Sequence, residues 1–127
     1  MNMFILWMAT NAEATTMVPL SIDQMVDLSS TVVRGTVTNV WTEPDAKTHT
    51  VWTYAQVEVE KVFKGNMSTD ILVVEQPGGT WGTTDTLVES VARFSVGEEG
   101  YFFIEKLKSG KMVTTGMHQG KFNIIMD

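Results

Sequence analysis

Residues 50–60 alternate between small or apolar side chains and polar or aromatic ones. A β-strand turns successive side chains to opposite faces, so this pattern predicts a long, half-buried strand. The turn sequence Lys64-Gly65-Asn66 follows, and Ile71-Leu72-Val73-Val74 predicts a second strand that ends at Pro77-Gly78-Gly79. This part of the chain is therefore predicted to form an antiparallel meander, and it contains no catalytic signature.

The segment before the meander predicts one helix and one strand. Ser21-Ile22-Asp23-Gln24 fits a capping box, and apolar residues then recur at helical spacing, which predicts a short helix over residues 21–29. Residues 31–41 are rich in β-branched side chains and predict a strand. Gly35 lies within it and marks a bend or bulge.

The segment after the meander predicts an irregular loop followed by short strands. The Gly- and Thr-rich residues 78–85 predict the loop, and residues 87–94 predict a weaker strand. Residues 101–105 are apolar on both faces and predict a central strand. The residues that follow predict a hairpin that turns at Ser109-Gly110, and residues 121–125 predict a final strand.

About six short strands and one helix indicate a mainly β domain over residues 15–127. We expect a small closed or nearly closed antiparallel barrel with one short N-terminal helix, because closure removes the exposed strand edges that invite aggregation. The predicted core is a set of large apolar residues on the strands: Val33, Val37, Val57, Val59, Ile71, Val73, Phe103 and Ile104.

Composition excludes several classes of function. The chain has 127 residues and no cysteine, which excludes disulfides, thiolate nucleophiles and thiolate zinc sites. Its formal net charge is −6 and its pI is about 4.8. Nonspecific binding to nucleic acid depends on basic patches that release counterions, so nucleic acid is not an expected partner.

The N-terminus resembles a truncated signal peptide. Residues 3–9 are apolar but too few to cross a bilayer, and Ala12-Glu13-Ala14 resembles a signal-peptidase site with cleavage after Ala14. Residues 1–14 would then be removed, which predicts a secreted or periplasmic protein without stable membrane insertion after processing. The alternative is that residues 4–7 form an edge strand or a short helix of the fold.

Three blocks resemble a poorly characterised family of exported prokaryotic proteins. They are residues 29–37, residues 54–65 ending in Lys61-Val62-Phe63-Lys64-Gly65, and residues 94–103. A loop of the form "PGG" at residues 77–79 and the sequence Gln119-Gly120-Lys121-Phe122 extend the resemblance over most of residues 20–123. The resemblance rests on the order and spacing of these motifs.

More distantly, the chain is similar to the netrin-like domains of tissue inhibitors of metalloproteinases. Those domains have a Cys-x-Cys-x-Pro N-terminus where this chain has Thr15-Thr16-Met17-Val18-Pro19, and a "V-I-R-A" strand where it has Val32-Val33-Arg34-Gly35. The resemblance implies a barrel like the oligonucleotide/oligosaccharide-binding (OB) fold. It also implies that a freed Thr15 could chelate a protease zinc, with Val18 and Pro19 stiffening the segment behind it. Both cysteines of those inhibitors are absent here.

The sequence predicts no catalytic residues, metal or cofactor. His49 and His118 belong to no spaced ligand set and are expected in turns or at the surface. Glu58 and Glu60 are explained by the solvated face of their strand. No nucleophile elbow or phosphate-binding loop occurs. We therefore expect a protein that is not an enzyme.

The aromatic residues Trp52, Tyr54 and Trp81 are the candidate recognition residues, together with Trp41. Their rings give a large contact area for a sugar or a peptide. The alternative is that the tryptophans cap the barrel core.

The sequence favours an exported binding or interaction module whose partner is a protein or a small ligand. The alternatives are a metalloprotease inhibitor that uses Thr15, Val18 and Pro19, and an uncharacterised enzyme or a carrier of a lipid or small ligand that uses the barrel interior.

Overall fold

The computed structural model describes residues 19–47, 49–88 and 91–123. The predicted signal segment, Thr15, Val18 and the end of the predicted final strand lie outside these residues. In chain order the elements are α1 (Ile22–Leu28), β1 (Thr31–Pro44), β2 (Val51–Lys64), β3 (Ile71–Pro77), β4 (Gly79–Trp81), β5 (Thr84–Thr86), β6 (Glu99–Lys106), β7 (Met112–Thr114), the 3-10 helix η1 (Met117–Gly120) and β8 (Lys121–Asn123).

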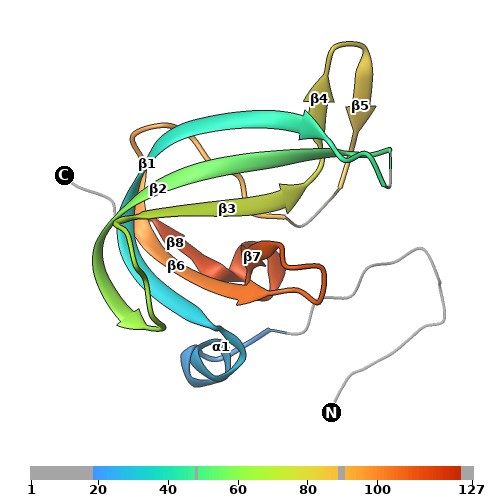
Figure 1. The fold of residues 1–127 in the computed structure, drawn as a ribbon. Helices are drawn as coiled ribbons and strands as arrows, with labels where there is room; N and C mark the ends of the chain where they lie inside the picture. Colours follow the sequence, from blue (N-terminus) through green and yellow to red (C-terminus); the bar gives the residue numbers. More distant parts are fainter. Residues whose placement is uncertain (1–18, 48, 89–90, 124–127) are drawn as a thin grey trace, which may run out of the picture.

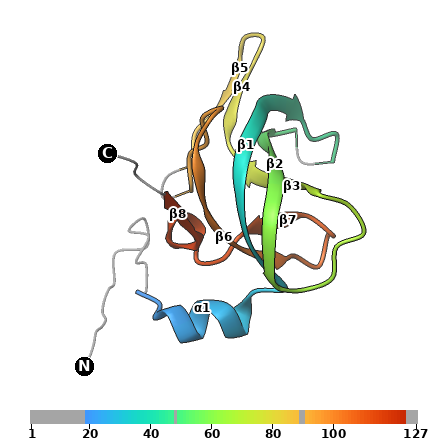
Figure 2. The ribbon, with the colours of Figure 1, turned by 90° about the vertical axis from the view of Figure 1, so that its left-hand side faces the viewer.

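Helix α1 begins at the predicted capping box. The Ser21 hydroxyl accepts a hydrogen bond from the Gln24 amide at 3.1 Å, and the Gln24 side chain accepts one from the Ser21 amide at 2.9 Å. The helix lies beneath the sheet (Figure 2) and buries Met25 against Val32 and Phe103. The predicted helix is confirmed.

The main sheet is antiparallel, with the strand order β3-β2-β1-β6-β7 and with β8 paired to β6 (Figure 1). Strand β1 is long enough to pair with β2 along one edge and with β6 along the other. Its register against β2 shifts between Arg34 and Gly35, which confirms the predicted bulge. Glycine is required here, because a Cβ atom on Gly35 would collide with the backbone oxygen of Glu58.

Side chains bridge the two edge strands of this sheet. Nε2 of Gln76 on β3 donates to Oγ1 of Thr114 on β7 at 2.6 Å, and Oε2 of Glu75 accepts from the Met112 amide at 3.0 Å. No backbone ladder joins β3 to β7 within the described residues, so the sheet remains open there. The predicted mainly β, antiparallel fold is confirmed, whereas backbone pairing does not close it into a barrel.

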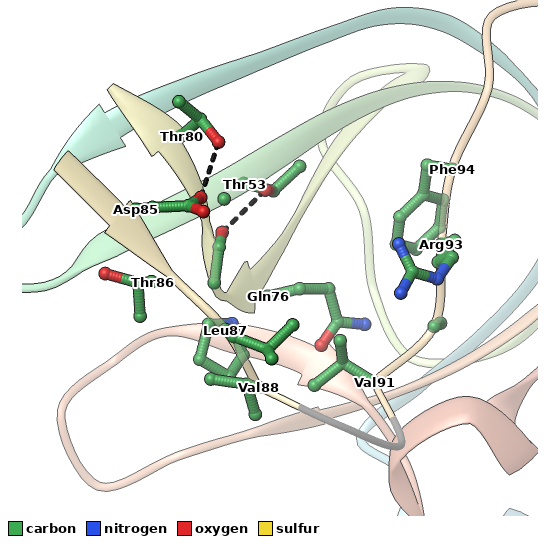
Figure 3. A pocket seen from close by; sticks show the side chains of 14 residues that line it. Thr53, Gln76, Thr80, Asp85, Thr86, Leu87, Val88, Val91, Arg93 and Phe94 are labelled. Carbon is green, nitrogen blue, oxygen red and sulfur yellow. Dashed lines mark hydrogen bonds between the residues drawn. The ribbon is translucent and has the colours of Figure 1, made fainter. Parts of the chain in front are cut away.

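A small hairpin occupies part of the segment that was expected to be an irregular loop. Gly78 and Gly79 have φ values of 105° and 134°, which lets the chain turn sharply from β3 into the β4–β5 hairpin. The predicted strand over residues 87–94 is wrong, since residues 87–88 and 91–94 form no strand. Leu87 leaves the sheet with its side chain 80% exposed, and this segment borders a pocket (Figure 3).

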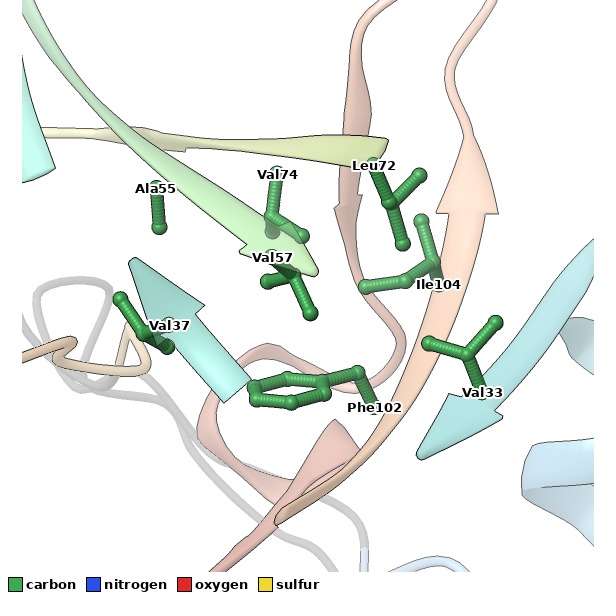
Figure 4. Packing of buried hydrophobic residues seen from close by; sticks show 8 residues of the cluster. All are labelled: Val33, Val37, Ala55, Val57, Leu72, Val74, Phe102 and Ile104. Atoms are coloured by element: carbon green, nitrogen blue, oxygen red, sulfur yellow. The ribbon is translucent and has the colours of Figure 1, made fainter. Parts of the chain in front are cut away.

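The core lies inside the curved sheet (Figure 4), where aliphatic side chains surround Phe102. Of the predicted core residues, Val33, Val37, Val57, Phe103 and Ile104 are buried, and Val59 is partly buried against them. Strand β6 is buried on both faces as expected, because Phe103 packs under α1 on the side opposite Phe102 and Ile104.

The predicted choice of the β3 side chains that face the core is wrong by one residue. Leu72 and Val74 point into the core, so Ile71 is 40% exposed and Val73 only partly buried. Four consecutive apolar residues do not show which two face inward. The two polar residues that follow, Glu75 and Gln76, do not show which face of β3 points inward. Gln76 is buried and bonded to Thr114, whereas Glu75 faces outward.

Candidate functional site

Three aromatic side chains line the outer face of the sheet near the turn between β1 and β2. Trp52 and Tyr54 are half-buried and alternate along β2 with the buried Val51 and Ala55, so they lie on the side away from the core. Trp41 is opposite Tyr54 in the strand register, and the two rings stack with their centroids 5.6 Å apart. The predicted pair of Trp52 and Tyr54 is therefore brought together at the surface.

Lys111, in the turn between β6 and β7, reaches across to this aromatic face. Its Nζ lies 4.3 Å from the centroid of the Trp52 ring and 5.9 Å from that of Tyr54. The same atom lies 3.4 Å from Oε1 of Glu75 and 3.5 Å from Oδ2 of Asp45. One ammonium group thus connects β2, β3 and the β1–β2 turn.

The surroundings of Lys111 raise its pKa above the ordinary value. Burial alone would lower that pKa, but charge interactions with Tyr54, Glu75 and Asp45 and the hydrogen bond to Glu75 outweigh it. Lys111 is therefore a permanent cation at neutral pH, and it holds the two carboxylates in fixed positions.

A depression of about 720 Å³ lies between the two turns. Further hydrogen bonds fix both of its carboxylates: Oδ1 of Asp45 accepts from the Lys47 amide at 2.8 Å, and Oε2 of Glu75 accepts from the Met112 amide. An aromatic ring beside fixed hydrogen-bond acceptors suits a neutral polar ligand. The lining residues come from both turns, β2 and β3: Asp45, Ala46, Lys47, Trp52, Glu75, Leu107, Ser109, Gly110 and Lys111.

Trp81 lies in an adjacent depression. Its side chain is 49% exposed on the β4–β5 hairpin, where it faces a hollow that His49 and Thr84 also line. Asp45 and Ala46 border both depressions, so Trp52 and Trp81 lie in two neighbouring depressions, whereas Tyr54 and Trp41 are not among the lining residues of either one. Trp41 and Trp52 are partly buried and Trp81 is 49% exposed, and none of the three belongs to the buried core clusters of the described residues.

The remaining predicted residues lie elsewhere. Pro19 is exposed at the start of the described chain, whereas Thr15 and Val18 fall outside it. His49 and His118 are exposed, as expected. Glu58 and Glu60 are also exposed, and Glu60 pairs with Arg34 at 3.4 Å.

Lys111, Asp45 and Glu75 are site residues that no sequence pattern predicts. Each looks like an ordinary charged residue in a turn or on a strand, and only the curling of the sheet brings β7 and its preceding turn beside β3. No regular motif spacing marks such a cluster. Within residues 19–47, 49–88 and 91–123, no group of three acidic or histidine side chains is arranged to hold a metal ion.

A search of protein-family models, of curated proteins and of solved structures found no match to this chain. In the described part of the chain, no helix is long and apolar enough to span a membrane.

Proposed function

We propose that this protein is an OB-like binding module. The OB fold is a partly open barrel of five antiparallel strands, in which the first strand pairs with both the second and the fourth. Strands β1, β2, β3, β6 and β7 match this order when the β4–β5 hairpin is treated as an insertion, and the bonds from Gln76 and Glu75 bring the first and last edges together. The resemblance to netrin-like domains agrees with this proposal.

The position of the depression beside Trp52 carries the functional proposal. OB folds bind their ligands on the face of the second and third strands and on the loops that follow the first and fourth strands. The corresponding parts here are β2, β3, the β1–β2 turn and the β6–β7 turn. These four parts line the depression, with Trp52, Glu75, Asp45 and Lys111 as their most distinctive side chains.

The chemistry of the depression favours an oligosaccharide among the ligands of such folds. The ring of Trp52 offers an apolar surface for a sugar ring, and Asp45 and Glu75 can accept hydrogen bonds from sugar hydroxyls. A nucleic-acid strand would instead place its phosphates beside these carboxylates, in a chain whose net charge is −6.

The same proposal makes the protein a non-enzymatic module. Asp45 and Glu75 both bind Lys111, so neither is poised to donate a proton to a substrate. The interior of the sheet is filled by the packed side chains of the core, including Phe102 and Ile104, which favours an outer binding site over a carrier function.

Ligand screening tests the proposed function. We expect a panel of chito-, cello- and malto-oligosaccharides to include one that binds saturably and perturbs the Trp52 indole signal in amide and indole NMR spectra. Single-stranded DNA and RNA oligonucleotides should not bind at physiological salt. Submicromolar binding of an oligonucleotide would contradict the oligosaccharide assignment. Binding of peptides, together with binding of none of the sugars, would contradict it as well.

We further propose that the module is exported and that its mature chain begins at Thr15. Expression of the full gene in its native host, followed by N-terminal sequencing, should give Thr15 as the first residue. An intact Met1 would contradict export. A Thr15 start would also make the inhibitor hypothesis testable, because its α-amine could then reach a protease zinc. Failure to inhibit a panel of zinc proteases would exclude that hypothesis.

A further inference from the structure

A second pocket, separate from the Trp52 depression, lies at the end of the sheet beside the β4–β5 hairpin (Figure 3). Its volume is about 300 Å³, and it shares no lining residue with the Trp52 depression. The end of β3, the hairpin and the segment 91–94 form its walls. A pocket of this size suits a small molecule or a single amino-acid side chain with its flanking groups.

Hydroxyl groups hold the hairpin wall of this pocket in place. Thr53 donates to the Gly78 carbonyl at 2.7 Å, and Thr80 donates to Oδ1 of Asp85 at 2.7 Å. The Thr86 hydroxyl accepts from the Val51 amide at 3.0 Å. The wall is therefore formed before any ligand arrives, which lowers the entropy lost on binding.

The amide of Gln76 has a defined orientation at this pocket. Gln76 is 3% exposed, and its Nε2 donates to the Thr114 hydroxyl at 2.6 Å. That hydroxyl donates in turn to the Met117 carbonyl at 2.6 Å, so it must accept from Gln76. Thr114 thus holds Nε2, and Oε1 is the amide atom that an N–H group of a ligand can reach from the pocket.

Arg93 supplies a cation on the side of Gln76 that is away from the β4–β5 hairpin (Figure 3). Its backbone is anchored, because Nζ of Lys121 donates to the Arg93 carbonyl while pairing with Glu98 at 2.8 Å. The next residue, Phe94, stacks on the core residue Phe102 with ring centroids 6.1 Å apart. The backbone that carries the exposed guanidinium is therefore held in place, and no ion pair engages the guanidinium in the described part of the chain.

Apolar side chains complete the pocket. Leu87, Val88, Val91 and Phe94 line it, and Leu87 is 80% exposed although it is one of the largest apolar residues in this region. A ligand with an apolar side chain would remove this surface from water, which is favourable in proportion to the area buried.

We propose that this pocket binds an apolar amino-acid residue that carries a free α-carboxylate. Arg93 pairs with the carboxylate, Oε1 of Gln76 accepts a hydrogen bond from the α-nitrogen, and Leu87 and Val91 contact the apolar side chain. A free amino acid and the C-terminal residue of a peptide share this chemistry. The pocket would add a second ligand to the oligosaccharide proposed above, and neither site depends on the other.

Titration of the full chain, followed by amide NMR, tests this assignment with four probes. L-Leucine or acetyl-glycyl-L-leucine should bind saturably and shift the amide signals of Gly78, Gly79 and Thr86. Preference for leucine identifies a free amino acid, and preference for the dipeptide identifies a peptide C-terminus. L-Leucinamide lacks the carboxylate and isocaproate lacks the α-nitrogen, so both should bind at least tenfold more weakly.

Variants separate this site from the Trp52 depression. Arg93→Gln should weaken binding of the carboxylate probes by roughly tenfold or more, since a charge-assisted hydrogen bond is lost. The matched control Lys108→Gln removes an exposed cation from the β6–β7 turn and should leave binding unchanged, as should Trp52→Ala. The assignment is overturned if neither leucine probe binds, if leucinamide or isocaproate binds as well as leucine, or if Arg93→Gln binds as the unaltered protein does.

Discussion

Val57→Asp is expected to destabilise the protein by several kcal/mol, because it places a charge in the centre of the core. Val57 is completely buried and belongs to the cluster that contains Phe102 and Ile104. No Lys or Arg side chain is among the buried residues of the described chain, so the carboxylate would be buried without an ion-pair partner. Because domains of this size have about 5–15 kcal/mol of stability, a large fraction of the variant should be unfolded at moderate temperature.

Thermal unfolding followed by circular dichroism measures this effect. Val62→Asp is the matched control, since it makes the same substitution on the same strand at a valine that is 41% exposed. The control should lower stability by about 1 kcal/mol, through loss of β-propensity, which is well below the effect at Val57. Equal melting midpoints for the Val57→Asp variant and the unaltered protein would contradict the assigned core.

The central strands could be predicted from sequence because local patterns and tertiary burial agree in them. Residues 51–57 alternate in sequence, and Val51, Ala55 and Val57 on the inward face are buried, while the capping box at Ser21 contains both of its bonds within one helical turn. Gly35 could be assigned to a bulge because no larger residue fits so close to the neighbouring strand. At these positions a short stretch of sequence is enough to predict the local structure.

Strand β3 and the segment after Thr86 show where local patterns fail. The inward face of β3 depends on the pairing of Val57 with Leu72 and on the bond from Gln76 to Thr114, which is 38 residues away. Residues 87–94 contain enough apolar side chains to suggest a strand, but the described part of this segment packs Ala92 and Phe94 against the fold without joining a sheet. Burial alone does not specify strand pairing.

The aromatic residue of the Trp52 depression could be predicted, and its charged residues could not. Trp52 and Tyr54 share a strand face, which alternation reveals directly. Lys111 is 59 positions from Trp52, and its contact depends on how far the sheet curls. A charged residue in a hairpin turn carries no sequence signal for such a contact, because the same residue type is common in turns that face only solvent.

Trp52→Ala should weaken oligosaccharide binding by about 2 kcal/mol or more, which corresponds to roughly thirtyfold in affinity. The substitution removes the central aromatic surface of the depression and the ring on which Lys111 rests. It should also lower stability by about 1–2 kcal/mol through loss of the cation–π contact and of the partly buried ring surface, so the protein should remain folded.

Isothermal titration calorimetry with the oligosaccharide that binds in the screen measures the loss of affinity separately from the loss of stability. Phe63→Ala provides the control, since Phe63 is an aromatic residue at the opposite end of β2, 52% exposed and outside the lining of the depression. We expect the control to retain full affinity. If Trp52→Ala binds as tightly as the unaltered protein while both variants are folded, the sugar does not bind at the depression formed by the two turns, and the OB-like placement of the site is wrong.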